Sequence, residues 1–191
     1  MKNLLIFFLI LLASLTLNAQ NCGHKNNSNE NCKGGKGNCV QAIDSVKYDL
    51  SSQEKDGLIY MRLEEKLARD VYLTLGTTHK QKMFVNIPQS EQRHMDAVKA
   101  LLDKYEIPDP VINDENGSFA NADIKKLYDD LVKKGQTSFK DAMLVGKEIE
   151  EMDIKDLVER IEQTDNPDIK SVYENLKQGS ENHLRAFTKH M

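Results

Sequence analysis

Residues 58–75, LIYMRLEEKLARDVYLTL, repeat apolar side chains at steps of three and four. That spacing is typical of an amphipathic α-helix, whose apolar stripe faces a core. Beyond residue 50, the two-residue alternation of strands is almost absent, and several further segments repeat the helical spacing. The sequence therefore predicts an all-α fold.

The first two long helices are separated by a short turn. The first is expected over about 53–75 and to end at Gly76, because glycine often caps helix C-termini. The second is expected to end near Tyr105. Its start stays open, because Pro88 suits either a first-turn position after an Asn86 cap or an internal kink.

The remaining helices follow a long connection. A short helix is expected over about 122–134, and a long one follows a Thr137 or Ser138 cap. The last helix follows Asn166 as N-cap, with Pro167 at its first helical position. Short turns make the first and last pairs of long helices antiparallel. The prediction is a four-helix bundle with one long crossover that carries a short extra helix.

The N-terminus has the pattern of a secretory signal peptide over residues 1–19. Lys2 precedes an apolar run of 14 residues, Leu4 to Leu17, and Ala19 precedes the expected cleavage point. A membrane-spanning helix needs roughly 20 residues, so an uncleaved anchor is the weaker alternative. We expect an exported protein, periplasmic or secreted, with no membrane segment in its mature form.

Residues 20–49 are rich in Asn, Gly and Lys, which is typical of a flexible tail. All three cysteines lie there, at Cys22, Cys32 and Cys39. In an oxidising compartment an odd number leaves one thiol free or paired with another chain. The cysteines could instead bind a soft metal, although their spacing matches no zinc motif. The bundle domain is expected over residues 50–191.

The charge balance of the chain limits the classes of partner that it can be expected to bind. The formal net charge is -4, with no clustered excess of Lys and Arg. Nucleic-acid binding needs such a cluster, so nucleic acid is not an expected partner. An acidic balance suits metal ions, which we expect as partners, and a homodimer stays open.

Each long helix interrupts its apolar stripe with side chains that bind metals. Glu65 lies in the first helix, Glu91 and His94 in the second, Glu150 in the fourth and His183 in the fifth. Glu91 and His94 are three residues apart and therefore share a helix face. The depths of these residues, counted from the hairpin turns, differ by about one helical turn or less. The five side chains are therefore predicted to converge on a metal site.

Buried carboxylates need a metal, a cationic partner or a proton. The alternative to a metal site is therefore a buried network of ion pairs. Its cations would come from Arg62, Arg69, Arg93 or Arg185, which mostly fall beside the apolar stripes.

Four parts of the chain carry a recognisable pattern: EEKLARDVY at 64–72, NI at 86–87 with SEQRHM at 90–95, IEEMDI at 149–154, and VYENL at 172–176 with NHLRAF at 182–187. These stretches resemble a bacterial family of unknown function within the ferritin-like group. The similarity covers about residues 50–188. It implies a ferritin-like bundle with a di-iron or di-manganese carboxylate centre.

The resemblance assigns the metal ligands residue by residue. These are Glu65, Glu91, His94, Glu150 and His183, with Tyr72 matching the first-helix pattern as well. Tyr72 is either a hydrogen-bonding or redox neighbour of the metals or a core residue.

The chain departs from the ferritin-like pattern at one position. The group carries a Glu three residues before the last histidine, and this chain has Ser180 there. Glu181 is turned about 100° away from that position, and Glu64 likewise lies off its stripe. Five protein ligands could mean an open coordination position, a single ion, or a site kept only for structure.

The expected function is that of an exported ferritin-like metal-binding protein with one or two iron or manganese ions. Its reaction would be an oxidoreduction of dioxygen, peroxide or Fe(II). The alternatives are a non-catalytic metal-binding or storage module and a structural helical interaction domain. The same ligands serve storage and catalysis, so the sequence leaves these open.

Overall fold

The computed structural model describes residues 46–189. The predictions for the signal peptide, the three cysteines and most of the tail lie outside these residues. Within 46–189 the fold is all-α and has no strand, which confirms the predicted class. The helices are α1 (Ser52–His79), α2 (Met83–Lys104), α3 (Ala122–Gly135), α4 (Phe139–Glu162) and α5 (Pro167–Thr188).

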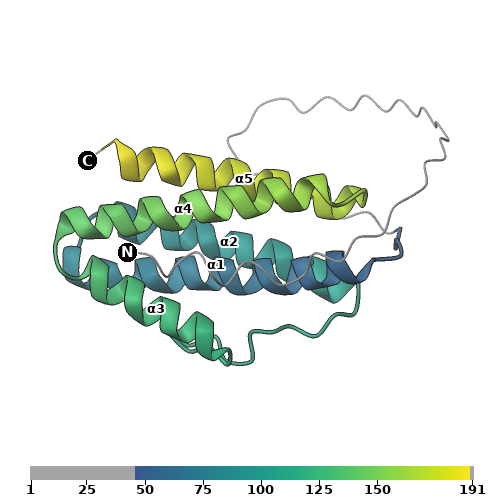
Figure 1. The fold of residues 1–191 in the computed structure, drawn as a ribbon, viewed down its shortest axis with the longest axis horizontal. Helices are drawn as coiled ribbons and strands as arrows, with labels where there is room; N and C mark the ends of the chain where they lie inside the picture. The colour runs from purple at the N-terminus through teal and green to yellow at the C-terminus, as the bar shows by residue number, and fades with distance from the viewer. Residues whose placement is uncertain (1–45, 190–191) are drawn as a thin grey trace. The chain divides into compact units, whose positions relative to one another are not determined.

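The four long helices lie alongside one another (Figure 1). α1 packs along α2, and α4 packs along α5, as two hairpins. α1 also contacts α4, and α2 contacts α5, so each long helix has two long neighbours. α3 lies in the connection between the hairpins and packs against α1 and α4. None of the described helices has an apolar stretch that would span a membrane.

Side chains cap α4 and α5 where the sequence predicted caps, and α1 at Ser51, which the sequence analysis did not predict. The Asn166 side chain accepts from two backbone N–H groups of α5, and Pro167 takes the first helical position. Ser138 caps α4 in the same way, and Ser51 forms a capping box with Glu54 at the start of α1. Each cap satisfies N–H groups that a helix start would otherwise leave unpaired.

The C-terminus of α1 differs from the prediction. The helix continues past Gly76 to His79, and Lys80 forms the cap in the left-handed region at φ 51°. A Cβ atom at Gly76 would lie 3.0 Å from the backbone oxygen of Phe84. Gly76 therefore serves the close approach of α1 and α2 rather than the end of the helix.

The start of α2 settles the two alternatives for Pro88. The helix begins at Met83, so Pro88 lies inside it and Asn86 is not its cap. The backbone N–H that proline lacks would have bonded Phe84, in the first turn of the helix.

The core of the bundle is divided along its length. One apolar cluster includes Tyr72, Phe84 and Phe187, near α3. A second includes Leu58 and Leu157, toward the other end. On every long helix, the predicted ligand residues are buried and lie between the two clusters in the sequence. A polar layer therefore crosses the middle of the core.

Candidate metal centre

The five predicted ligands gather in the polar layer. They form two groups, Glu65 with Glu91 and His94, and Glu91 with Glu150 and His183. In each group one ligand atom per residue lies within 4.8 Å of the others. Glu91 belongs to both groups, so the side chains outline two adjacent cation positions that share one carboxylate.

Both imidazoles turn Nδ1 toward the carboxylates. Nδ1 of His94 lies 2.8 Å from Glu91 Oε2 and 3.2 Å from Glu65 Oε2. Nδ1 of His183 lies 2.9 Å from Glu91 Oε1 and 3.6 Å from Glu150 Oε1. A neutral imidazole binds a metal through one ring nitrogen, and here Nδ1 is the nitrogen in position for both histidines.

The two imidazoles lie side by side between α2 and α5. The rings of His94 and His183 stack with centroids 5.6 Å apart. A Cβ atom at residue 179 would lie 2.4 Å from Nε2 of His94. Gly179 therefore provides the space on α5 that lets His94 point inward from α2.

The carboxylates are more deeply buried than the imidazoles. Glu65, Glu91 and Glu150 are each 1% exposed, while His94 is 9% and His183 is 8% exposed. The centre thus approaches solvent on its histidine side, and its carboxylates lie in a dry interior.

Burial and mutual charge shift the acid–base behaviour of the site. Burial raises the pKa of Glu65 to about 7, and burial together with the charge of Glu91 raises the pKa of Glu150 to about 8. Burial acts to raise the pKa of Glu91 as well, but His94 and His183 outweigh it and lower that pKa.

The pKa values of the two imidazoles are raised, although burial acts to lower them. Burial lowers the pKa of His183, yet Glu150 and Glu91 outweigh it and raise this pKa to about 10. The pKa of His94 is raised in the same way, by Glu65 and Glu91. Without metal, two imidazolium groups therefore balance part of the carboxylate charge.

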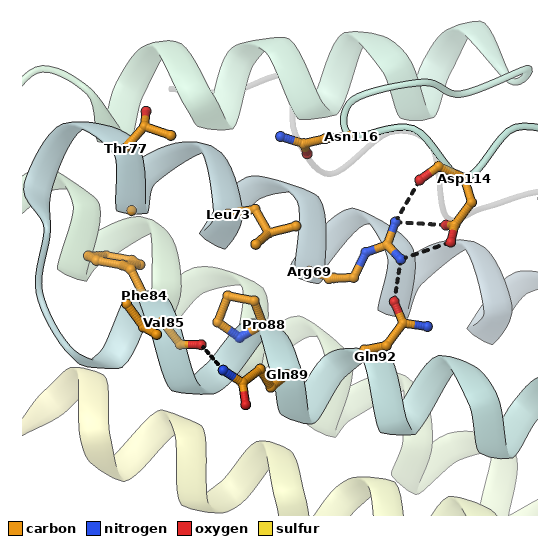
Figure 2. Close-up of a pocket in the computed structure, with 11 residues that line it drawn as sticks. Arg69, Leu73, Thr77, Phe84, Val85, Pro88, Gln89, Gln92, Asp114 and Asn116 are labelled. Atoms are coloured by element: carbon orange, nitrogen blue, oxygen red, sulfur yellow. Dashed lines mark hydrogen bonds and ion pairs between the residues drawn. The ribbon is translucent and has the colours of Figure 1, made fainter.

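The arginines of the alternative network bind elsewhere. Arg62 pairs with Asp109, and Arg69 pairs with Asp70 and Asp114. Figure 2 shows Arg69 reaching from α1 to Asp114 in the crossover and to a glutamine of α2. Arg93 and Arg185 lie on the surface side of their helices. Among the ion pairs of residues 46–189, only histidines approach the three glutamates.

Several atoms of the site have no hydrogen-bond partner. Within the described residues these include Oε1 of Glu65, Oε1 of Glu91 and Nδ1 of His183. The last two are 2.9 Å apart and form an ion pair when the imidazole is protonated, but their geometry is not that of a hydrogen bond. Buried polar atoms without partners cost free energy, and a cation shared by such atoms would remove that cost. The donor set, carboxylate oxygen and imidazole nitrogen, fits iron or manganese.

The comparisons with known proteins establish the family. A family model described as an uncharacterized protein domain, DUF2202, matches residues 54–191. The chain belongs to the DUF2202 family. It is 59% identical over 143 residues to the uncharacterized protein MJ0754 of Methanocaldococcus jannaschii, which covers 75% of this chain and 77% of the relative.

A solved structure supports the fold of this DUF2202 domain. The crystal structure of hypothetical protein MJ0754 from Methanococcus jannaschii DSM 2661 has 58% sequence identity to this chain and a TM-score of 0.74. The similarity covers 76% of this chain and 83% of that chain. These names state no activity, so function rests on the site itself.

Tyr72 combines both roles that the sequence left open. Its hydroxyl donates to Glu150 Oε1 at 2.7 Å. Its ring packs against Phe84 and Phe187, with centroids 6.4 and 5.2 Å away. Tyr72 is therefore both a core residue and a hydrogen-bonding neighbour of a ligand carboxylate.

Two further acids of the DUF2202 domain are buried close to the centre. Glu64 is 6% exposed, although the sequence placed it off the apolar stripe. Glu64 is buried off the stripe because α4 covers this side of α1 with Asp156 and Arg160, whose charges act on Glu64. Asp153, on the inner stripe of α4, is 4% exposed and was not among the predicted ligands.

On α5, Ser180 faces the interior and Glu181 does not, as the helical spacing predicted. Ser180 is 1% exposed and faces the interior, at the position where the resemblance expects a glutamate. Glu181 lies off the inner face and pairs with Lys177 at 2.9 Å.

A surface pocket of about 600 Å³ lies along α1 and α2 in the DUF2202 domain. Its lining includes Arg69, Leu73, Val85 and Pro88 (Figure 2). None of the five predicted ligands lines it. The pocket and the candidate metal centre are therefore separate features.

Proposed function

We propose that this DUF2202 domain is a ferritin-like metalloprotein that binds two iron or manganese ions and oxidises or reduces a small substrate, namely dioxygen, peroxide or Fe(II). The observation that carries the proposal is the pair of ligand groups that share Glu91. A carboxylate between two positions suits a pair of ions, because it can offer one oxygen to each.

The arrangement of helices supports the ferritin-like part of the proposal. Ferritin-like bundles join two antiparallel hairpins by one long crossover and draw metal ligands from all four helices. Here α1–α2 and α4–α5 are the hairpins, and α3 lies in the crossover. Each long helix supplies at least one of the five ligand residues.

Each residue then has a defined role. Glu65 with His94 and Glu150 with His183 would be the outer ligands, and Glu91 would be the shared one. Bound iron or manganese would supply one-electron redox chemistry at the centre. The apolar clusters on both sides exclude water, and the Tyr72 hydroxyl donates its hydrogen bond to Glu150 so that this carboxylate stays oriented.

Metal content is the first test. Protein purified without a metal-chelating tag and incubated with Mn²⁺ or anaerobic Fe²⁺ should retain about two ions per chain after desalting. Elemental analysis by mass spectrometry gives the number. A chain that retains no ion would overturn the proposal and leave the structural interaction domain.

Reactivity separates an oxidoreductase from a storage module. Fe²⁺-loaded protein should consume dioxygen or peroxide over many turnovers when a reductant is supplied, as followed with an oxygen or peroxide electrode. Retention of two ions with at most one turnover per site would overturn the catalytic part of the proposal and leave metal binding alone.

We also propose that the mature chain is exported and contains no membrane segment. The signal-peptide pattern of residues 1–19 supports this, and the acidic balance gives no support to nucleic acid as a partner. The mass of the native protein tests the first point, because cleavage after Ala19 leaves Gln20 as the first residue.

A further inference from the structure

Asp153 lies in the same polar layer as the five predicted ligands. It follows Glu150 by three residues on α4, so the two side chains share a helix face. The inner face of α4 therefore presents Glu-x-x-Asp at the spacing with which α2 presents Glu91 and His94.

The two oxygens of Asp153 have different surroundings. Oδ2 accepts a hydrogen bond from the hydroxyl of Ser180 on α5. Oδ1 is buried and has no hydrogen-bond partner. Ser180 thus orients the carboxylate and leaves one oxygen with both lone pairs unused.

Burial and neighbouring acids act on the carboxylate of Asp153. Burial, followed by the charges of Glu65, Glu64 and Glu150, raises the pKa of Asp153 well above its usual value, and the hydrogen bond from Ser180 opposes this shift. Glu65 and Glu150 come from different ligand groups. The carboxylate of Asp153 is therefore within electrostatic reach of one glutamate from each group, although it belongs to neither group itself.

We propose that Asp153 is a sixth protein ligand of the metal centre and binds through Oδ1 while Ser180 holds Oδ2. The carboxylate that the ferritin-like pattern places at position 180 would then be supplied from α4 instead of α5. This inference rests on the proposed function, because it assigns a ligand of the same centre.

Charge balance supports a fourth carboxylate. Two divalent ions carry four positive charges, and Glu65, Glu91 and Glu150 supply only three negative ones when His94 and His183 are neutral. Ionised Asp153 supplies the fourth. A buried centre with no net charge avoids the cost of placing uncompensated charge in a dry interior.

The test is the metal stoichiometry and affinity of Asp153→Asn. Asparagine preserves the shape of the side chain and removes the charge. Wild-type protein titrated with Mn²⁺ should bind two ions, and the variant should bind one, or a second at least about tenfold more weakly. Calorimetry and the manganese electron paramagnetic resonance signal report both quantities without any activity measurement.

A matched control and a rescue complete the design. Asp156 is a buried aspartate one turn further along α4, and it accepts a hydrogen bond from the Tyr60 hydroxyl. The control variant Asp156→Asn should still bind two ions. In Asp153→Asn, the further change Ser180→Glu should restore the second ion, because it returns a carboxylate to the centre from α5.

The outcomes distinguish this inference from the proposed function. If wild-type protein binds no metal, both are overturned. If wild-type protein binds metal and folded Asp153→Asn binds it with the same number and affinity, only the assignment of Asp153 is overturned. If the variant does not fold, a crystal structure of Mn²⁺-loaded wild-type protein decides, since Oδ1 of Asp153 must then contact an ion.

Discussion

Two buried acids, Asp70 and Glu65, lie only five residues apart on α1, and their partners differ completely. Asp70 is 0% exposed and bonds Lys66, Arg69 and the backbone N–H of Gly117. Glu65 is 1% exposed, has one oxygen without a partner, and meets a histidine through the other. The first acid has permanent cations built in, and the second has only imidazoles that can give up their protons.

This difference is the one we expect between an ion-pair network and the ligand set that we propose. Lysine and arginine stay charged and compete with any metal for the carboxylate. A histidine that loses its proton becomes a metal ligand itself. The Asp70 network connects α1 to the crossover through Gly117 and Asp114. We infer that it stabilises the fold, whereas the Glu65 side of α1 is built to receive cations.

The largest expected effect is on stability at the Asp70 network. Asp70→Asn would leave the buried charges of Lys66 and Arg69 without their common partner, which should cost about 3 to 5 kcal/mol of unfolding free energy. Urea unfolding measures the loss. The bound metal per folded chain should not change.

The control for Asp70 is an exposed ion pair. Asp129→Asn removes the partner of Lys125 on the surface of α3 and should cost less than about 1 kcal/mol. Equal losses for Asp70→Asn and Asp129→Asn would contradict the structural role of the buried network.

The next largest effect is on metal binding through Glu91. Because Glu91 belongs to both ligand groups, Glu91→Gln should lower the affinity for both ions by at least about 100-fold, roughly 2.7 kcal/mol. Glu65→Gln and Glu150→Gln should each lower the affinity for chiefly one of the two ions. Competition with a fluorescent chelator measures the affinities.

Glu181→Gln is the control for these substitutions, because Glu181 pairs with Lys177 away from the centre. It should bind metal as the wild type does. If the wild-type protein instead binds no metal and Glu91→Gln loses about 3 to 5 kcal/mol of stability, the centre is an ion-pair network like that of Asp70.

The third effect is a dependence of metal affinity on pH. The neighbouring carboxylates raise the pKa of His183 to about 10 against burial, and burial raises the pKa of Glu150 to about 8. Metal must displace these protons, so affinity should rise between pH 6 and pH 8, by up to about 1.4 kcal/mol per pH unit for each proton displaced.

Calorimetry in buffers of different ionisation enthalpy measures the released protons directly. At pH 8 release should still be seen, because the pKa of His183 lies above that value. An affinity that falls between pH 6 and pH 8 would contradict the assignment of the histidines as ligands.

A smaller effect is expected at Tyr72. Tyr72→Phe removes the hydrogen bond to Glu150 and retains the ring, so it should weaken metal binding by about 1 kcal/mol, roughly fivefold. Tyr128→Phe removes a buried hydroxyl that bonds Thr74 and serves as the control. Metal affinities that do not differ between the two variants would leave Tyr72 as a core residue only.

The smallest effect is expected at the N-terminus. A chain that begins at Val40 should keep its full helical circular dichroism and melt within about 3 °C of the longer protein, because residues 20–39 have few apolar side chains to bury. Lys47, which the sequence places in the tail, pairs with Glu106 and is retained. A large loss of helicity would show that the tail belongs to the fold.

Local signals predicted much of the fold. Ser138 and the pair Asn166-Pro167 mark helix starts that depend only on nearby backbone, and both positions agree with the structure. The end of α1 could not be predicted in that way. Gly76 faces the backbone of Phe84 on the next helix, and sequence spacing carries no information about that contact.

The convergence of the five candidate residues could be predicted because each one interrupts a regular apolar stripe. The burial of Glu64 was not predicted, because one apolar stripe per helix describes a single buried face, whereas α1 contacts α2, α3 and α4. Asp153 lies on the apolar stripe of α4, but the orientation of its carboxylate depends on a hydrogen bond from Ser180 on another helix, which the sequence spacing does not predict. The binding of metal by the five residues stays a prediction until ions are counted.

The polar layer that divides the core has a consequence for cooperativity. Within residues 46–189, the apolar clusters at the two ends are separate, and the four long helices and the groups of the layer lie between them. Ions held by all four helices would act as a cross-link at mid-height. Hydrogen exchange should therefore show the two ends opening with different free energies in the metal-free protein and as one unit once metal is bound.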